Sequence, residues 1–89
     1  MLDKFENLLL IDASDNKITE VTQSLPNLNS FLLMNNRLKK FPVLNNMQKL
    51  IVLNLKSNNI KDLNNVNPKK IPNVQNLDLS DNKIGYEGQ

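Results

Sequence analysis

Residues 74–84 read VQNLDLSDNKI, and the last nine of these letters almost repeat LIDASDNKI at residues 10–18. Each copy of the phrase brings two carboxylates and a serine close together. The phrase is therefore either a catalytic or metal-binding motif, or one unit of a structural repeat. The rest of the chain, which has 17 Asn and 16 Leu among its 89 residues, decides between these alternatives.

One frame, L-x-x-L-x-L-x-x-N-x-L with other apolar residues allowed at the Leu positions, fits the chain four times. The copies begin at Leu8, Leu28, Leu50 and Val74. Their asparagines, spaced by 20, 22 and 24 residues, are Asn16, Asn36, Asn58 and Asn82. In-phase matches along a chain are the signature of a repeat architecture. We therefore expect residues 1–89 to form a single domain of about four coils, each made of one frame and the return path to the next.

This pattern resembles the leucine-rich repeat family, whose period lies within about 20–29 residues. The resemblance covers residues 5–84, and the mean spacing of 22 is most similar to the short type of the protein phosphatase-1 regulatory subunit and the spliceosomal A-prime protein. It implies an α/β fold: a right-handed leucine-rich repeat solenoid with a short parallel β-sheet on its concave face. Coils of this length leave room on the convex face only for 3₁₀ turns or short helices.

The alternation within the frame predicts a short strand that buries one face. Stacking the coils then aligns the buried residues in columns. The expected strand columns are Leu8, Leu28, Leu50, Val74; Ile11, Phe31, Leu53, Leu77; Ala13, Leu33, Leu55, Leu79; and Ile18, Leu38, Ile60, Ile84. The return paths are expected to add Val21, Phe41, Leu63, Phe5, Leu25, Met47 and Ile71.

The frame asparagines are expected to face inward and to form a structural ladder of Asn16, Asn36, Asn58 and Asn82. A buried turn leaves backbone polar groups unpaired, which costs free energy unless they are hydrogen-bonded. Asn carries two donors and an acceptor on a short stem, so it can bond the backbone of its own and an adjacent coil. An inward position does not suit a ligand-binding role.

The carboxylates of the repeated phrase are too dispersed for a metal or catalytic site. Asp12 and Asp78 share a column three coils apart, about 14–15 Å at the usual strand spacing, whereas calcium ligands lie about 2.3–2.6 Å from the ion. The spacing D-x-S-D-N also lacks the Gly and the distal Glu of a calcium loop. The chain has no His and no Cys, and no Ser stands beside a base, so we expect no enzyme, no catalytic residues and no cofactor or metal.

The outward strand positions form rows on the concave surface that favour a protein partner. An apolar group is expected in the middle, between acidic rows, and such patches tend to mark contact surfaces, although single exposed aliphatic residues are normal. The predicted partner-binding residues are Asp12, Leu32, Met34, Val52, Asn54, Lys56 and Asp78. The first hypothesis is a protein–protein interaction module, of which a regulatory subunit of a phosphatase is a variant.

A basic ridge along one edge supports an alternative. Lys17, Arg37 and Lys83 follow frame asparagines, and the ridge is extended by Lys39, Lys40 and Lys61. Contact with phosphates at Arg37, Lys39 and Lys40 would suit a ribonucleoprotein component similar to the spliceosomal A-prime protein. However, no stacking aromatic residues accompany the ridge, as readers of single-stranded RNA need, and the net charge is only +2. A solvated edge is the competing interpretation.

The sequence also allows predictions of the cellular location and of the oligomeric state. The N-terminal letters MLDKFENLLL do not form a signal peptide, and no stretch approaches the roughly 18 apolar residues of a membrane span. We therefore expect a cytoplasmic or nuclear protein without membrane contact. Glu87 stands where the last return path needs an apolar residue, so we expect either a fragment lacking a C-terminal cap or an end buried against another molecule, including an end-to-end dimer.

Overall fold

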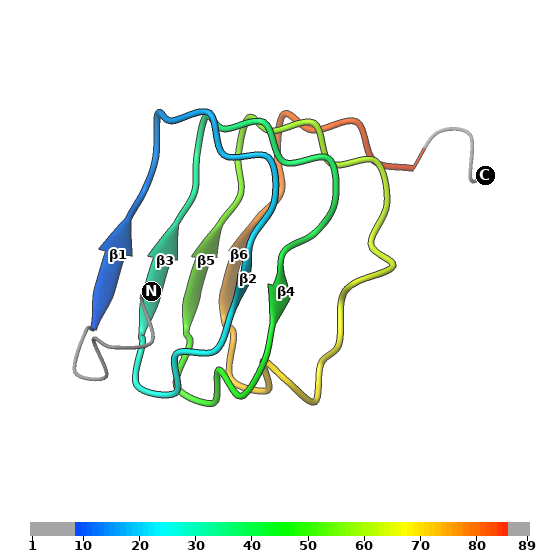
Figure 1. The fold of residues 1–89 in the computed structure, drawn as a ribbon. Helices are drawn as coiled ribbons and strands as arrows, with labels where there is room; N and C mark the ends of the chain where they lie inside the picture. The colour runs from blue at the N-terminus through cyan, green and yellow to red at the C-terminus, as the bar shows by residue number, and fades with distance from the viewer. Residues whose placement is uncertain (1–8, 86–89) are drawn as a thin grey trace.

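The computed structural model describes residues 9–85, and Figure 1 shows this part of the chain winding through successive coils that lie side by side. Successive coils contribute the strands of a four-stranded sheet: β1 Leu10–Asp12, β3 Ser30–Leu32, β5 Val52–Asn54 and β6 Asn76–Asp78. All neighbouring strands in the order β1-β3-β5-β6 are parallel, because each return path brings the chain back to start the next strand in the same direction. The parallel sheet predicted from the repeated frame is confirmed.

The strands are in register at equivalent positions of the frame. The inward positions that pair across the sheet are Ile11 with Phe31, Phe31 with Leu53, and Leu53 with Leu77. Because side chains alternate along a strand, this register puts the inward residues in one column and the outward residues in rows on the opposite face. A slip by one residue would bring the whole column to the solvent, so burial of the column fixes the register.

The hydrophobic core lies mainly in the middle coils. The buried apolar residues are Leu25, Leu28, Phe31, Leu33, Leu38, Phe41, Leu44, Met47, Leu50, Leu53, Leu55, Ile60 and Ile71. All of these except Leu44 were predicted from the frame and its return paths. Apolar residues of the outer coils, including Ile11, Ala13, Val74, Leu79 and Ile84, are only partly buried, since a coil at the end of the described segment is covered on one side.

Two predicted core positions are exposed. Leu77 belongs to the column of Phe31 and Leu53, yet 43% of it is exposed because no further described coil covers β6. Leu63 is also 43% exposed, and the nearby Val66 packs against the core instead. The expected core residues Phe5 and Leu8, and the expected cap position Glu87, lie outside the described residues.

The convex side differs from the expectation. Residues 9–85 contain neither an α-helix nor a 3₁₀ helix, so the predicted 3₁₀ turns or short helices are not found in this part of the chain. Two short strands, β2 Thr22–Gln23 and β4 Val43–Leu44, form a second parallel sheet there. An extended chain covers about 3.3 Å per residue against 1.5 Å in a helix, so it crosses a short return path in few residues. Pro42 adds to this preference, because the residue before a proline is biased to an extended conformation.

The third return path, between β5 and β6, does not add a strand to the second sheet and contacts the preceding return path through a side chain. The Nδ2 group of Asn65 donates to the carbonyl oxygen of Phe41 at 2.9 Å. No described residue between Lys61 and Lys70 pairs with β4 as a strand. The second sheet therefore ends at β4, while the first sheet continues to β6.

Candidate binding surface

Each strand of the four-stranded sheet is followed by a turn residue with a positive φ angle. These residues are Asp15 (60°), Asn35 (56°), Ser57 (61°) and Asp81 (55°). Asn and Asp are enriched in this left-handed region, whereas most other side chains avoid it. The repeat frame predicts a turn at the asparagines, but it does not predict the left-handed residue before each of them. The available signal was the recurrence of Asp or Asn immediately before three of the four frame asparagines.

The turn aims the next residue, the frame asparagine, at the backbone of two coils. The Nδ2 group of Asn36 donates to Leu33 O and Met34 O in its own coil, at 3.1 and 3.2 Å, and to Ala13 O in the preceding coil at 3.1 Å. Its Oδ1 atom accepts the N–H of Ile18 at 3.1 Å. One amide thus satisfies four backbone groups.

The same contacts recur at the next frame positions. Asn58 Nδ2 donates to Leu33 O and Leu55 O, both at 3.0 Å, and its Oδ1 accepts from Leu38 N at 3.1 Å. Asn82 Nδ2 donates to Leu55 O at 2.9 Å, and its Oδ1 accepts from Ile60 N at 3.0 Å. Asn36 and Asn58 are buried, and Asn82 is half-buried.

Asn16 points toward the backbone of its own turn, as Asn36 does, but it is not buried. It is exposed, and its Nδ2 group donates only within its own coil, to Ala13 O at 2.9 Å and Ser14 O at 3.1 Å. The reason is its place at the N-terminal end of the described segment, where no described coil precedes it. Among the described residues, Asn16 bonds only the turn of its own coil.

The structure brings the predicted partner-binding residues together on the outer face of the four-stranded sheet. Cross-strand register aligns Asp12, Leu32, Asn54 and Asp78 in one row. Val52 lies in the neighbouring row, and Met34 and Lys56 lie just beyond the ends of β3 and β5. Leu32, Met34 and Val52 are half-buried, and Asp12 and Lys56 are exposed. An open hollow of about 450 Å³ between β5 and β6 is lined in part by Val52, Asn54 and Asp78.

Leu10 extends this face and was not among the predicted partner-binding residues. It lies on β1 in the same row as Val52, through the pairing of Leu10 with Ser30 and of Ser30 with Val52. The residue is 55% exposed. The signal that could have found it is its outward position in the frame, one residue before Ile11.

Three of the predicted partner-binding residues accept hydrogen bonds from the backbone of their own turns. Asp12 Oδ1 accepts the N–H of Ser14 at 3.0 Å, Asn54 Oδ1 accepts that of Lys56 at 3.0 Å, and Asp78 Oδ1 accepts that of Ser80 at 2.9 Å. An Asx side chain that bonds the backbone two residues on is a common turn device. The recurrent Asp at this column therefore has a local structural reason beside any binding role.

The hydrogen bonds of these turns also lower the pKa values of Asp12 and Asp78. The backbone N–H and the hydroxyl of Ser14 lower the pKa of Asp12 below its usual value of 3.8. The hydroxyl and backbone N–H of Ser80, with a smaller contribution from the Lys56 charge, lower the pKa of Asp78. Hydrogen bonds to a carboxylate favour its charged form. Both acids are thus negatively charged at neutral pH.

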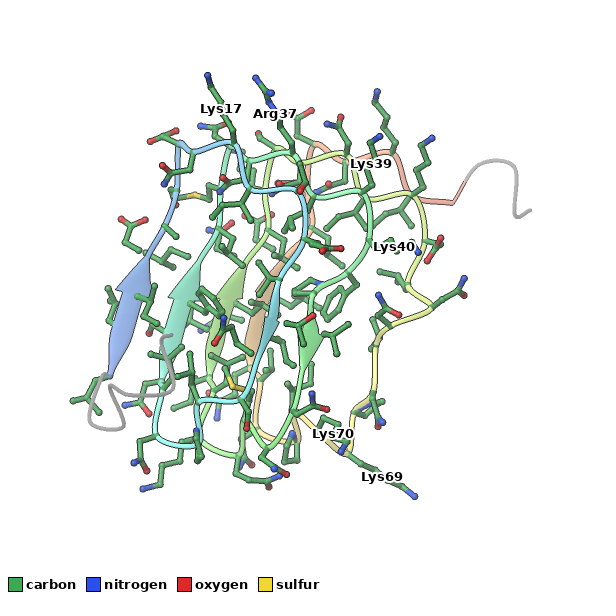
Figure 2. The ribbon with its side chains drawn as sticks, in the orientation of Figure 1. Lys17, Arg37, Lys39, Lys40, Lys69 and Lys70 are labelled. Atoms are coloured by element: carbon green, nitrogen blue, oxygen red, sulfur yellow. The ribbon has the colours of Figure 1, made fainter. Side chains whose placement is uncertain are left out.

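The basic ridge lies along a different part of the molecule. Figure 2 shows Lys17 and Arg37 at the edge where the strands end, and Lys39 and Lys40 further along the return path. Lys69 and Lys70 lie at the opposite edge. Lys17, Arg37, Lys39 and Lys40 are exposed, and within residues 9–85 none of these four ridge residues forms an ion pair with a carboxylate. The ridge is therefore a separate surface from the outer face of the sheet.

Residues 9–85 offer no group of three or more His, Cys, Asp or Glu side chains that could hold a metal ion. Within the same part of the chain, no helix is long and apolar enough to cross a membrane.

Comparison with known families agrees with this geometry. The family model described as Leucine Rich repeat matches residues 46–63 and 70–88. These segments contain β5, β6 and two of the frame asparagines, and the same turn and ladder contacts recur in the preceding coil. Residues 46–63 and 70–88 are thus identified as leucine-rich repeats. No curated protein and no solved structure matches it significantly.

Proposed function

We propose that this chain is a protein–protein interaction module that binds its partner on the outer face of the four-stranded sheet. Leucine-rich repeat domains commonly mediate protein–protein interactions and are generally non-enzymatic. One observation carries the proposal: an apolar group of Leu32, Met34 and Val52 lies between the acidic side chains of Asp12 and Asp78 on one face. We assign no catalytic residue, cofactor or metal to this module.

The dimensions of the face suit a helix or a narrow loop. Four strands at about 4.8 Å spacing place Asp12 and Asp78 about 14–15 Å apart, and a helix with its side chains is about 10–12 Å wide. A partner that presents an apolar stripe flanked by Lys or Arg would match the apolar centre and both acids. Asn54 and Lys56 would then supply polar contacts at the side of β5.

The experiment compares affinity capture by the intact chain and by the double variant Leu32→Glu, Met34→Lys. We expect the variant to keep its thermal melt and to lose its captured protein, because both side chains point away from the core. Val43→Lys, on β4 of the second sheet and 37% exposed, is the control for an added charge. Undiminished capture by the double variant would contradict the proposal.

The basic ridge supports a second candidate, a ribonucleoprotein component that contacts phosphates through Arg37, Lys39 and Lys40. The supporting observation is that these exposed cations lack carboxylate partners within the described residues. Capture repeated after nuclease treatment, and with Lys39→Glu, Lys40→Glu, distinguishes the two. Loss of capture in both of these tests, with the outer-face variant unaffected, would favour this candidate. A regulatory subunit of a phosphatase is a form of the first proposal and would be captured with the enzyme.

A further inference from the structure

The chemistry of the outer face changes in a fixed order from one coil to the next. The row that runs across β1, β3, β5 and β6 presents an acid, an apolar residue, an amide and an acid: Asp12, Leu32, Asn54 and Asp78. Met34 follows Leu32 by two residues, and Val52 precedes Asn54 by two, so both lie on the same face. The two middle coils thus present half-buried apolar side chains, and the first and fourth coils each present a carboxylate.

This order sets the direction in which a partner must lie. A helix laid along the strands is about 10–12 Å wide, so it covers only two or three coils. It would miss one of the two carboxylates, which lie about 14–15 Å apart. A segment that crosses the strands meets the carboxylate of β1, the apolar side chains of the middle coils and the carboxylate of β6 in turn.

The spacing of the coils matches a helix better than an extended chain. Neighbouring strands lie about 4.8 Å apart, and successive turns of an α-helix rise about 5.4 Å, so the two repeats differ by only about 0.6 Å per coil. Residues on one face of an extended segment are about 6.6 Å apart, which differs from the coil spacing by about 1.8 Å. Over three steps the extended segment is out of step by about 5.4 Å, more than one strand spacing, whereas the helix is out of step by about 1.8 Å.

We propose that the partner presents an α-helix that crosses the strands and carries Lys or Arg at positions i and i+11 and apolar residues at i+4 and i+7. These four positions form one stripe of a helix, and the last three rise about 6, 10.5 and 16.5 Å from the first. The apolar pair contacts Leu32, Met34 and Val52, and the two cations pair with Asp12 and Asp78. The long stems of Lys and Arg absorb the difference of about 2 Å at the fourth coil. The inference rests on the proposed function and adds the conformation, direction and residue spacing of the partner.

The two carboxylates are held in place but are not equivalent. Asp12 and Asp78 each accept a backbone N–H of their own turn, from Ser14 at 3.0 Å and from Ser80 at 2.9 Å. The pKa of Asp12 is lowered by the backbone N–H and hydroxyl of Ser14, whereas that of Asp78 is lowered by Ser80 and also by the Lys56 charge. Because Lys56 already compensates part of the charge of Asp78, the cation over Asp12 should contribute more to binding.

A synthetic helix tests this pattern without the natural partner. The probe carries lysine at its first and twelfth positions, leucine at its fifth and eighth, and alanine or glutamine elsewhere, with a lactam bridge on the opposite side that holds the helix. We expect it to bind the intact chain and to lose binding to the Leu32→Glu, Met34→Lys variant. Val43→Lys, on the second sheet, should leave the affinity unchanged.

Two control peptides test the helix itself. The first exchanges each leucine with a neighbouring glutamine, so that the apolar side chains leave the stripe while the composition stays the same. The second keeps the stripe but replaces the bridge by two prolines on the opposite side, which break the helix. We expect both controls to bind at least about tenfold more weakly than the probe, because they cannot place both leucines on the middle coils.

A double-mutant cycle tests the register of the helix on the coils. Asp12→Asn removes the charge, and its amide oxygen can keep the bond to Ser14 N, as Asn54 bonds Lys56 N. We expect this variant to bind the probe up to about fivefold more weakly, as loss of an exposed ion pair does, and Asp78→Asn to have a smaller effect. In the Asp12→Asn chain, changing one of the two lysines of the probe to glutamine should have no further effect, whereas changing the other should still weaken binding. In the Asp78→Asn chain the two lysines should exchange these roles.

The outcomes separate this inference from the proposed function. Equal affinity for the probe and for either control peptide would overturn the helix, and lysine substitutions that add fully to both Asp variants would overturn the register. Failure of the probe to bind would overturn the helical partner in every case. If the intact chain nevertheless captures a protein that the Leu32→Glu, Met34→Lys variant loses, the proposed function stands. If that variant captures as well as the intact chain, the proposed function fails whatever the probe does.

Discussion

Asn58 Oδ1 accepts the backbone N–H of Leu38 at 3.1 Å, and both residues are buried, so an amide side chain joins two coils inside the core. The same amide group holds the turn of its own coil through Leu55 O at 3.0 Å. Asn58 therefore links the local turn to the stacking of coils. A carboxylate could not do this, because it has no donors, and an aliphatic side chain offers neither donor nor acceptor.

Asn58→Leu should destabilise the fold although it adds apolar surface. The backbone groups that Asn58 bonds would be left unsatisfied in a buried place, at a cost of about 1–3 kcal/mol for each group. The matched control is Asn16→Leu, because Asn16 is exposed and bonds only within its own coil. Chemical denaturation measures both, and equal losses at the two positions would contradict the bridging role of the ladder.

Ser57→Asn should stabilise the fold by up to about 1 kcal/mol, since a left-handed conformation costs most side chains about 1–2 kcal/mol and Asn less. Ser57 has φ of 61° and donates through Oγ to Asp81 Oδ2 at 2.8 Å. Asn35, at the same position of its coil, donates through Nδ2 to an aspartate of the preceding coil, Asp15 Oδ1, at 2.8 Å. The asparagine side chain of the Ser57→Asn variant can therefore keep the hydrogen bond to Asp81. It also lowers the free-energy cost of the positive φ angle at this position.

The control for Ser57→Asn is Ser57→Val, which removes the hydroxyl and places a β-branched residue at positive φ. Thermal melts should rank the variants as Asn above Ser above Val. If Val proves as stable as Ser at this position, the turn does not impose the left-handed conformation in solution.

Leu55→Ala should cost about 2–5 kcal/mol, as truncation of a buried leucine does. Leu55 is fully buried between two coils. Leu77→Ala removes the same atoms from a residue that is 43% exposed, so its loss should be clearly smaller. The free energy of unfolding of each variant decides this, and a native-like cooperative melt for Leu55→Ala would reject the assigned core.

Acid should weaken the fold through Asp12 and Asp78. The pKa of each acid is lower in the folded chain than the usual 3.8, so their contribution is present above that value. It is lost as the pH falls through the lower folded pKa values. Asp78→Asn should reduce this acid sensitivity while keeping the turn, because Asn54 bonds Lys56 N in the same way. Denaturation midpoints at neutral and acidic pH, compared between the variant and the intact chain, measure the effect.

The frame alone was enough to place the strands and the core of the middle coils. Its period-two alternation puts Phe31 and Leu53 inward, and the recurring asparagine marks each turn. Leu77 follows the same rule but is exposed, since burial of a repeat residue depends on the neighbouring coil as well as on its own sequence. The same dependence applies to Asn16, which has no described coil before it to bond, whereas Asn36 bonds Ala13 O of the coil before it.

The return paths were less predictable because they do not follow the frame. 3₁₀ turns or short helices were expected there, whereas the chain is extended at β2 and β4. Leu44 was not expected in the core. On the outer face, the frame gave the outward direction of Asp12 and Asp78. It could not show that their carboxylates would bond Ser14 and Ser80, since that depends on the turn conformation at Asp15 and Asp81.

The spacing between the start of a strand and its asparagine is constant, while the return path varies. The strand starts at residues 10, 30, 52 and 76 precede the asparagines by 16 − 10, 36 − 30, 58 − 52 and 82 − 76, or six residues each time. The asparagines precede the next strand by 30 − 16, 52 − 36 and 76 − 58, or 14, 16 and 18 residues. Added length is thus absorbed wholly on the convex side, without any change of register. The return path between Lys61 and Lys70 is consequently the natural place to graft a foreign loop or epitope onto this scaffold.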